Sequence, residues 1–219
     1  MKIKLKIFSI LLTAILLSAC GKEDYVYPNL LTEMVCLKTN NEGYGFQILT
    51  DDGTVWNFRE GNRPDSLTSD SIYRVICRFA PLSSNDGSEQ EATAYSFQSV
   101  ISPIPLPESS FKSIHTDPVN IQSIWQSKNY LNMILLIKIK EKGSKLAFVD
   151  QGVSVNEDGT QTLTLMLYHN RNNDVEGYDQ KYYLSVPLWH YQDKLQKGDQ
   201  IVFKLNTYKE GMTNRTFTY

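Results

Sequence analysis

The chain has 219 residues, of which 41% are hydrophobic, and its 22 basic and 24 acidic side chains give a formal net charge of −2. A chain of this length can bury one large core or two small ones. The slightly acidic balance leaves no basic surface for a polyanion, so the composition excludes a nucleic-acid-binding protein.

The first nineteen residues have the order of a secretory signal peptide. Three lysines lie within the first six residues, an apolar run extends from Ile7 to Leu17, and Ser18 and Ala19 precede Cys20. This basic, apolar and small-residue order is typical of a cleaved signal. As a helix the apolar run spans roughly 16 Å, about half of a bilayer core, which argues against a permanent membrane-spanning helix. Cleavage leaves 19 basic and 24 acidic side chains, a formal charge of −5.

The segment Leu17-Ser18-Ala19-Cys20 resembles a lipobox, where bacteria attach a lipid to the cysteine and cleave the chain before it. The resemblance implies that Cys20 carries the lipid and that residues 20–32 form a tether. Several acyl chains hold a protein durably, since each buried methylene contributes about 0.8 kcal/mol. We therefore expect a lipoprotein of the bacterial outer membrane.

Lys22, Glu23 and Asp24 follow this cysteine closely. They are similar to the lysine-plus-two-acids signal that sends some lipoproteins to the outer face of the outer membrane. The resemblance implies a protein at the cell surface. The alternative is an ordinary solvated tether and a protein that faces the periplasm.

Beyond the lipidation site the chain has two cysteines, Cys36 and Cys77, each inside an apolar, β-branched run. Disulfides persist in the cell envelope, so the two could be bonded. Buried free thiols would occupy the same kind of run. The sequence leaves both alternatives open.

Residues 33–101 predict a small five-stranded barrel of the oligonucleotide/oligosaccharide-binding (OB) type. The best local signal is a hairpin, in which Phe46, Ile48, Val55 and Trp56 flank a turn at Asp51-Asp52-Gly53. Glycine- and proline-containing stretches at 59–70 and 81–90 predict exposed loops. The expected strands are 33–39, 44–50, 54–58, 71–79 and 91–100.

Residues 102–116 begin with alternating prolines at positions 103, 105 and 107, which favour an extended spacer between two domains. Residues 117–219 then predict an immunoglobulin-like β-sandwich. Residues 129–140 could also form a helix, but the alternation of Ile137, Lys138, Ile139 and Lys140 favours a central strand. The expected strands are 120–126, 130–140, 145–150, 160–169, 181–186, 200–208 and 214–219.

Six short segments follow one another in the order Leu49 to Trp56, Arg74 to Ile76, Asp117 to Ile121, Tyr168 to Asn170, Ser185 to Leu188 and Asn206 to Tyr208. Together they resemble the NigD-like family of bacterial envelope lipoproteins. The resemblance implies an OB-type barrel followed by a β-sandwich and, from the family's association with bacteriocin genes, an immunity role. It implies no catalytic residues. Loops 81–90 and 170–180 are this chain's own, so no ligand specificity carries over.

Asp65-Ser66-Leu67 and Asp70-Ser71-Ile72 each resemble the Asp-Ser/Thr-aliphatic acceptor of bacterial O-glycosylation. Both lie in or beside the predicted loop, where a transferase could reach a hydroxyl. Ser66 is the better candidate because Ser71 starts a predicted strand. The alternative is two ordinary loop serines beside capping aspartates.

The sequence predicts no metal site, no cofactor and no enzyme. His115, His169 and His190 lack a partner ligand at metal-binding spacing, and His169 is better explained as a structural residue. A glycine-containing loop holds Asp174, Glu176 and Asp179 without a calcium-loop pattern, which favours a solvated turn. No Gly-x-Ser-x-Gly segment offers a serine nucleophile, while a pair of glycosidase carboxylates leaves no sequence signature.

Trp56, Trp125 and Trp189 could form platforms for a sugar or a peptide, although such aromatics more often pack within a sandwich. We interpret the chain as a lipid-anchored binding protein of the envelope, with an unidentified protein partner and an immunity-type role. The alternatives are a surface glycan-binding protein and an adhesion or assembly protein that uses an exposed edge strand.

Overall fold

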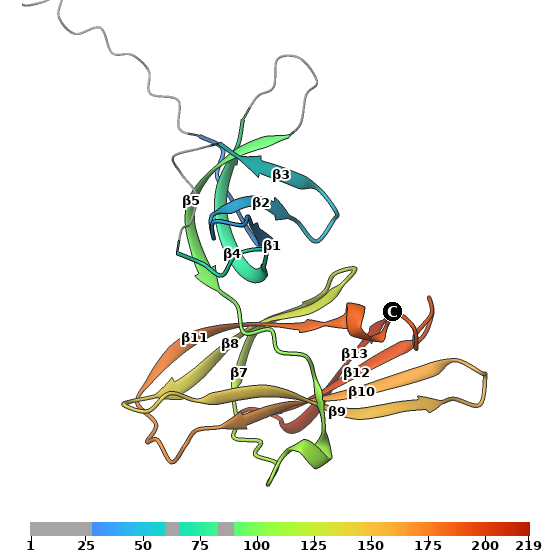
Figure 1. Ribbon diagram of the computed structural model, residues 1–219. Helices are drawn as coiled ribbons and strands as arrows, with labels where there is room; N and C mark the ends of the chain where they lie inside the picture. Colours follow the sequence, from blue (N-terminus) through green and yellow to red (C-terminus); the bar gives the residue numbers. More distant parts are fainter. Residues whose placement is uncertain (1–27, 60–65, 83–89) are drawn as a thin grey trace, which may run out of the picture.

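The structure is a computed structural model that describes residues 28–59, 66–82 and 90–219. Thirteen strands in these residues form a closed barrel and a two-sheet sandwich (Figure 1). This architecture confirms the predicted all-β class. Among the described residues no helix is long and apolar enough to cross a membrane.

The barrel closes in the order β1-β2-β3-β5-β4, with β4 returning to β1. Alternate residues along its strands point inward, which is the pattern that a strand with one buried face requires. Phe79, Cys77 and Val35 are fully buried in this core. The barrel strands are β1 (Leu31–Thr39), β2 (Gly45–Leu49), β3 (Val55–Phe58), β4 (Ile72–Pro81) and β5 (Glu91–Ser99).

The predicted hairpin joins β2 to β3. Leu49 pairs with Val55, the backbone N–H of Thr50 donates to the carbonyl of Thr54 at 2.9 Å, and Gly53 has a φ of +95°. Glycine adopts this φ without a steric penalty. Most of the two predicted loops, at 60–65 and 83–89, lies outside the described residues.

The sandwich packs a five-stranded sheet, β13-β12-β10-β9-β6, against a three-stranded sheet, β11-β8-β7. β10 and β12 run parallel, whereas most other neighbours are antiparallel. Two short 3₁₀ helices are η1 (Glu108–Ser110) and η2 (Leu188–Tyr191). The sandwich strands are β6 (Leu106–Pro107), β7 (Asn120–Gln126), β8 (Tyr130–Ile139), β9 (Lys145–Val155), β10 (Gln161–Asn170), β11 (Tyr178–Pro187), β12 (Gln200–Thr207) and β13 (Gly211–Thr218).

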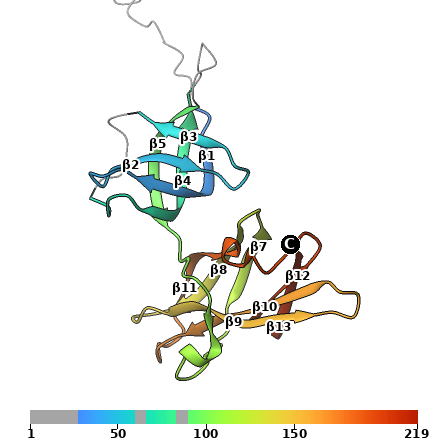
Figure 2. The same cartoon turned by 45° about the vertical axis from the view of Figure 1, so that its right-hand side comes forward.

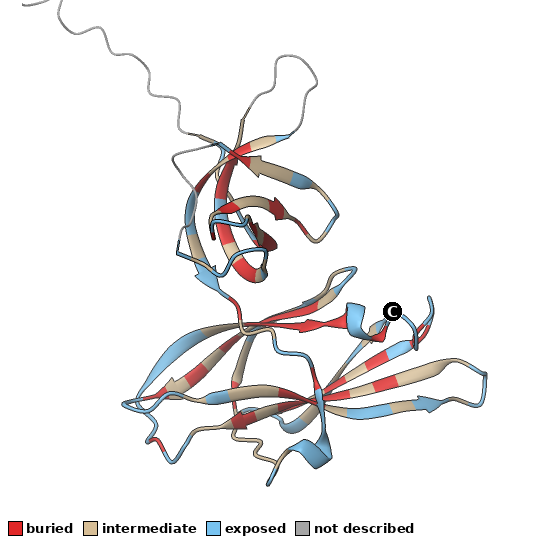
Figure 3. Ribbon diagram, in the orientation of Figure 1, coloured by how far each residue is buried: buried red, intermediate tan, exposed pale blue. Residues whose placement is uncertain are grey.

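β8 is the middle strand of the three-stranded sheet, so the segment that could also form a helix is a strand. Leu131, Met133, Leu135 and Ile137 are all fully buried along it. Buried positions alternate with more exposed ones along most strands, which places one core between the two sheets (Figure 3).

The proline-rich segment, which the sequence predicts as an extended spacer, is also paired with the sandwich. Leu106 and Pro107 pair in parallel with Val149 and Asp150, which adds β6 to the edge of the five-stranded sheet. Proline suits an edge strand because one side of such a strand needs no N–H donor. The segment is therefore part of the sandwich surface.

Cys36 and Cys77 are both free thiols in the structure, so it has the unbonded form of the two alternatives that the sequence left open. Cys36 pairs with Arg74, and Cys77, three residues further along β4, pairs with Glu33. Three residues along a strand reverse the side-chain direction, so Cys77 points into the barrel core. Burial, with a smaller effect of the Glu33 charge, raises the pKa of Cys77 to about 12.

Candidate functional site

A groove runs between the barrel and the three-stranded sheet of the sandwich. Figure 2 shows the barrel next to β8 and β11, on the side of the sandwich where η2 begins. Three pockets open along this boundary, with volumes of about 370, 370 and 230 Å³, and each is lined by residues from both domains. We define these three pockets as the interdomain groove.

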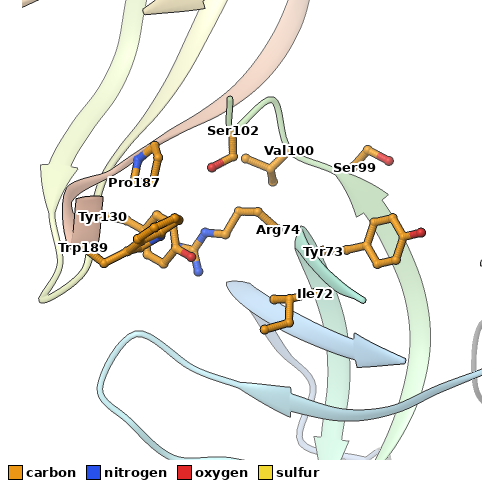
Figure 4. Close-up of a pocket in the computed structure, with 9 residues that line it drawn as sticks. All are labelled: Ile72, Tyr73, Arg74, Ser99, Val100, Ser102, Tyr130, Pro187 and Trp189. Atoms are coloured by element: carbon orange, nitrogen blue, oxygen red, sulfur yellow. The ribbon is translucent and has the colours of Figure 1, made fainter. Parts of the chain in front are cut away.

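Arg74 lies at the centre of the groove. It sits near the start of β4 and points away from the barrel core, and its side chain is only 3% exposed. Its guanidinium pairs with the carboxylate of Asp51, with N–O distances of 2.7 and 2.8 Å. It also lies over the ring of Tyr130, 3.9 Å from the ring centroid (Figure 4). A buried arginine needs such partners, because a buried charge without them is costly.

Two further partners of Arg74, Ser185 and Asn132, come from the sandwich. The Arg74 Nε donates to the Ser185 hydroxyl at 3.0 Å. One terminal nitrogen donates to the side-chain amide oxygen of Asn132 at 2.9 Å. The Asn132 amide donates to Asp51 at 2.9 Å, and the Ser185 hydroxyl donates to Asn132. Asn132 and Ser185 are fully buried on β8 and β11. The network therefore fixes the barrel against the sandwich.

Cys36 and Tyr130 complete this network. The Cys36 sulfur lies 3.2 Å from the Tyr130 hydroxyl and 3.8 Å from an Arg74 nitrogen. Burial is the main cause that raises the pKa of Tyr130 to about 12, and the hydrogen bond with Cys36 adds to it. The nearby Arg74 charge and a hydrogen bond from Trp189 oppose the rise. Tyr130 therefore stays a neutral phenol at physiological pH.

Trp189 and Ile72 form the apolar wall of the groove. Trp189 is 42% exposed on η2, and Ile72 is 68% exposed at the start of β4. Both line the pockets beside Tyr130 (Figure 4). Pro187 precedes η2, and the Leu188 N–H donates to the Asn129 carbonyl at 2.8 Å, which positions the helix. The groove thus presents large apolar groups on a fixed framework.

Trp125 lines the third pocket, on another part of the boundary. It is 37% exposed on β7 and shares the pocket with Glu33 and Met34 of the barrel. Burial raises the pKa of Glu33, and the charges of Asp52 and Asp51 add to the rise. This end of the groove therefore carries the Glu33 carboxyl close to the Asp51 carboxylate that pairs with Arg74.

Several predicted site residues lie elsewhere. Cys20, Lys22, Glu23 and Asp24 fall outside the described residues. Ser66 is exposed, with a φ of +57°, while the Ser71 hydroxyl donates to the Ser69 carbonyl at 2.9 Å.

Trp56 packs into the barrel beside Phe79, with 5.9 Å between ring centroids, and so forms no open platform.

His169 and Asp174, which the sequence offered as candidate metal ligands, are hydrogen-bonded within the fold. Among the described residues no three His, Cys, Asp or Glu side chains are grouped to hold a metal ion. Buried His169 bonds through one ring nitrogen to the Asp117 carbonyl at 2.8 Å and through the other to Ser144 at 3.0 Å. Asp174 is buried and accepts backbone N–H groups of the β8–β9 loop, rather than lying in a solvated turn.

The sequence reasoning missed the Arg74 network as a site. A charged residue within the apolar run Arg74-Val75-Ile76-Cys77 was the available signal. A charged side chain on an otherwise buried strand requires a partner, but the sequence does not show which residue provides it.

Comparison with solved structures finds proteins that are similar to this chain over most of its length. A NigD-like immunity protein from Bacteroides caccae is 31% identical, with a TM-score of 0.69, and the alignment covers 89% of this chain and 99% of that one. A protein of unknown function from Bacteroides vulgatus is 18% identical, with a TM-score of 0.64 and coverage of 86% and 91%. A candidate lipoprotein from Bacteroides fragilis is 11% identical, with a TM-score of 0.56 and coverage of 87% and 97%.

The last two likenesses show the fold alone. No curated protein matches the sequence. Residues 102–219 match the family model of the NigD-like C-terminal beta sandwich domain, and this match begins at the proline-rich segment that carries β6. With more than half of the chain matched by this model and the Bacteroides caccae protein aligned over nearly all of it, the chain belongs to the NigD-like family.

Proposed function

We propose that this protein is a lipid-anchored envelope protein of the immunity type, which protects its cell by capturing a bacteriocin and catalyses no reaction on it. Family membership supports the proposal, since a relative of nearly equal extent is described as an immunity protein. The signal-peptide pattern and the lipobox-like segment that ends at Cys20 support attachment to the membrane by a lipid.

The observation that carries the proposal is the interdomain groove. Ile72, Trp189 and Trp125 expose apolar surface there, at 68%, 42% and 37%. Exposed apolar groups in a cleft mark protein interaction sites, and aromatic anchors contribute most of the binding energy. Because Arg74 is bonded to both domains, the groove is already formed before a partner arrives, which lowers the entropic cost of binding.

A growth-protection assay tests the function. A strain that lacks the gene is exposed to culture supernatants that contain bacteriocins, and is complemented with wild type, Ile72→Asp or Val155→Asp. We expect wild type and Val155→Asp to protect and Ile72→Asp to fail, because a carboxylate in the apolar wall would be desolvated without a partner. Val155 is the matched control, since it is 74% exposed at the far end of β9. A deletion strain that remains fully resistant would exclude the immunity role.

A separate experiment tests the membrane attachment and the exposure at the cell surface. Protease is added to intact cells that express wild type, a Cys20→Ala variant or a variant with alanine at Lys22, Glu23 and Asp24. We expect Cys20→Ala to leave the membrane fraction, wild type to be cleaved and the triple variant to be spared. If wild type is also spared, the protein faces the periplasm and the partners to screen are envelope proteins.

A further inference from the structure

A separate pocket of about 480 Å³ lies on the sandwich, and all of its lining residues belong to that domain. η2 provides one wall with Trp189, the β7–β8 turn provides Lys128 and Asn129, and the turn before β12 provides Lys197. Its volume falls within the range of about 300–1,000 Å³ that is typical of small-molecule sites.

The lysine and amide side chains that line this pocket have no hydrogen-bond or ion-pair partner in the described part of the chain. Lys128 and Lys197 are exposed and form no ion pair there, in contrast to Lys138, which pairs with Glu176 at 3.5 Å. Within the same described residues, the side-chain amides of Gln126, Asn129 and Gln192 make no hydrogen bond. Two cationic and three amide side chains are therefore available to a ligand.

Backbone hydrogen bonds hold the three walls in place. The Leu188 N–H donates to the Asn129 carbonyl at 2.8 Å, which joins η2 to the β7–β8 turn. The Gly198 N–H donates to a main-chain oxygen of Tyr219 at 3.0 Å. The buried Asp199 carboxylate accepts the Gln196 N–H at 2.8 Å. The lysine of this turn is thus presented from a fixed backbone.

We propose that this pocket binds an acidic saccharide, with one pyranose ring on the exposed face of Trp189. The apolar face of a sugar ring matches a flat indole, which buries area at a low cost in entropy. Amide groups both donate and accept, as the hydroxyls of a sugar require. The two ammonium groups provide charge-assisted hydrogen bonds to a sugar carboxylate. This combination of flat face, amides and cations favours a charged sugar over a neutral one.

Calorimetric titration of the mature chain tests this inference. The probes are a galacturonate tetramer, the neutral tetramer maltotetraose and a tetraglutamate peptide. We expect the galacturonate tetramer to bind most tightly, with an affinity that falls as salt rises. Trp189→Ala should weaken binding by up to about tenfold, the scale of one aromatic contact. A double variant, Lys128→Gln with Lys197→Gln, should bind the acidic and neutral tetramers alike.

The matched controls are Trp125→Ala, a similarly exposed tryptophan in another pocket, and Lys138→Gln, a lysine with its own carboxylate partner. Neither should change the affinity, and the melting temperature of each variant verifies its fold.

Three outcomes would overturn the inference. The first is the absence of a titration signal with the galacturonate tetramer. The second is an affinity for tetraglutamate equal to that for the galacturonate tetramer. The third is a loss of affinity in Trp125→Ala equal to the loss in Trp189→Ala. The double lysine variant also separates the two proposals, because its lysines line no pocket of the interdomain groove and it should still protect cells in the growth assay.

Discussion

Arg74 is the residue on which the relation between the two domains depends most directly. Its side chain is 3% exposed and meets a carboxylate, an amide and a hydroxyl. Breaking such a pair by removing one partner leaves the other group buried without compensation. Arg74→Met should therefore lower the free energy of unfolding by about 3 kcal/mol, measured by urea denaturation.

Arg59 offers the matched control, because its pair with Glu91 is exposed, at 62% and 37% of the side chains. Arg59→Met should change the stability far less, since surface ion pairs contribute little. Equal losses in the two variants would show that the buried Arg74 network contributes no more to stability than an exposed ion pair.

Asp174 gives the fold a dependence on pH. Its carboxylate accepts backbone N–H groups of Lys140, Glu141, Lys142 and Val175. The Lys140 bond is the largest cause that lowers the pKa of Asp174, the other three bonds add to it, and burial opposes them. A group with a lowered pKa stabilises the fold above its unfolded pKa of about 3.9 and loses that contribution as pH falls through the folded value.

Asp174→Asn should therefore lower the melting temperature at neutral pH, and the gap to wild type should narrow below about pH 4. Thermal unfolding at several pH values measures the gap. A difference in melting temperature that stays constant down to pH 2.5 would mean that the charge of the Asp174 carboxylate does not contribute to stability.

At the scale of elements, two barrel turns differ in how strictly they require glycine. Gly43 and Gly53 have φ values of +78° and +95°, where an L side chain costs about 1–2 kcal/mol. A Cβ on Gly53 would meet open space, whereas one on Gly43 would collide with the backbone oxygen of Leu67. Gly53→Ala should cost about 1–2 kcal/mol and Gly43→Ala clearly more, measured by urea denaturation. The opposite order would exclude this packing at Gly43.

Regular strands could be predicted because their side chains alternate. Ile201, Phe203 and Leu205 are separated by polar or less apolar residues in the sequence, and all three are fully buried on β12. β6 could not be predicted in this way, because two residues that include a proline show no period. Its strand character comes from pairing with Val149 and Asp150, more than forty positions away, which is a tertiary effect.

At the scale of the whole molecule, the connection between the domains is bonded along its length. The Ile101 N–H donates to the Tyr183 carbonyl at 2.9 Å, the Ser185 N–H donates to the Ile101 carbonyl at 3.0 Å, and the Ser102 hydroxyl donates to the Ser185 carbonyl at 2.6 Å. Together with the Arg74 network, these bonds couple the barrel to the sandwich. We therefore expect one calorimetric unfolding transition in wild type.

Ser102→Ala combined with Arg74→Met should separate this transition into two, because independent domains unfold independently. Differential scanning calorimetry measures both chains. Two transitions in wild type would show that the domains are not coupled.

The candidate site could not be predicted from the sequence, because its residues come together only after folding. The partners of Arg74 lie 23, 58 and 111 residues away in the chain, in the β2–β3 turn, on β8 and on β11. No local pattern links residues at such separations. The family resemblance predicted a barrel and a sandwich, but the contact between them depends on side chains that meet only when both have folded.

The position of Trp189 also means that the intrinsic tryptophan fluorescence of the protein should report ligand binding. Trp189 borders two pockets of the groove and the separate pocket on the sandwich, whereas Trp56 is packed beside Phe79. A ligand in any of the three pockets that Trp189 borders would remove water from a half-exposed indole and move its fluorescence emission to shorter wavelength. Unlabelled protein can therefore be screened for partners by its own emission, and a Trp189→Phe variant shows which part of the signal arises there.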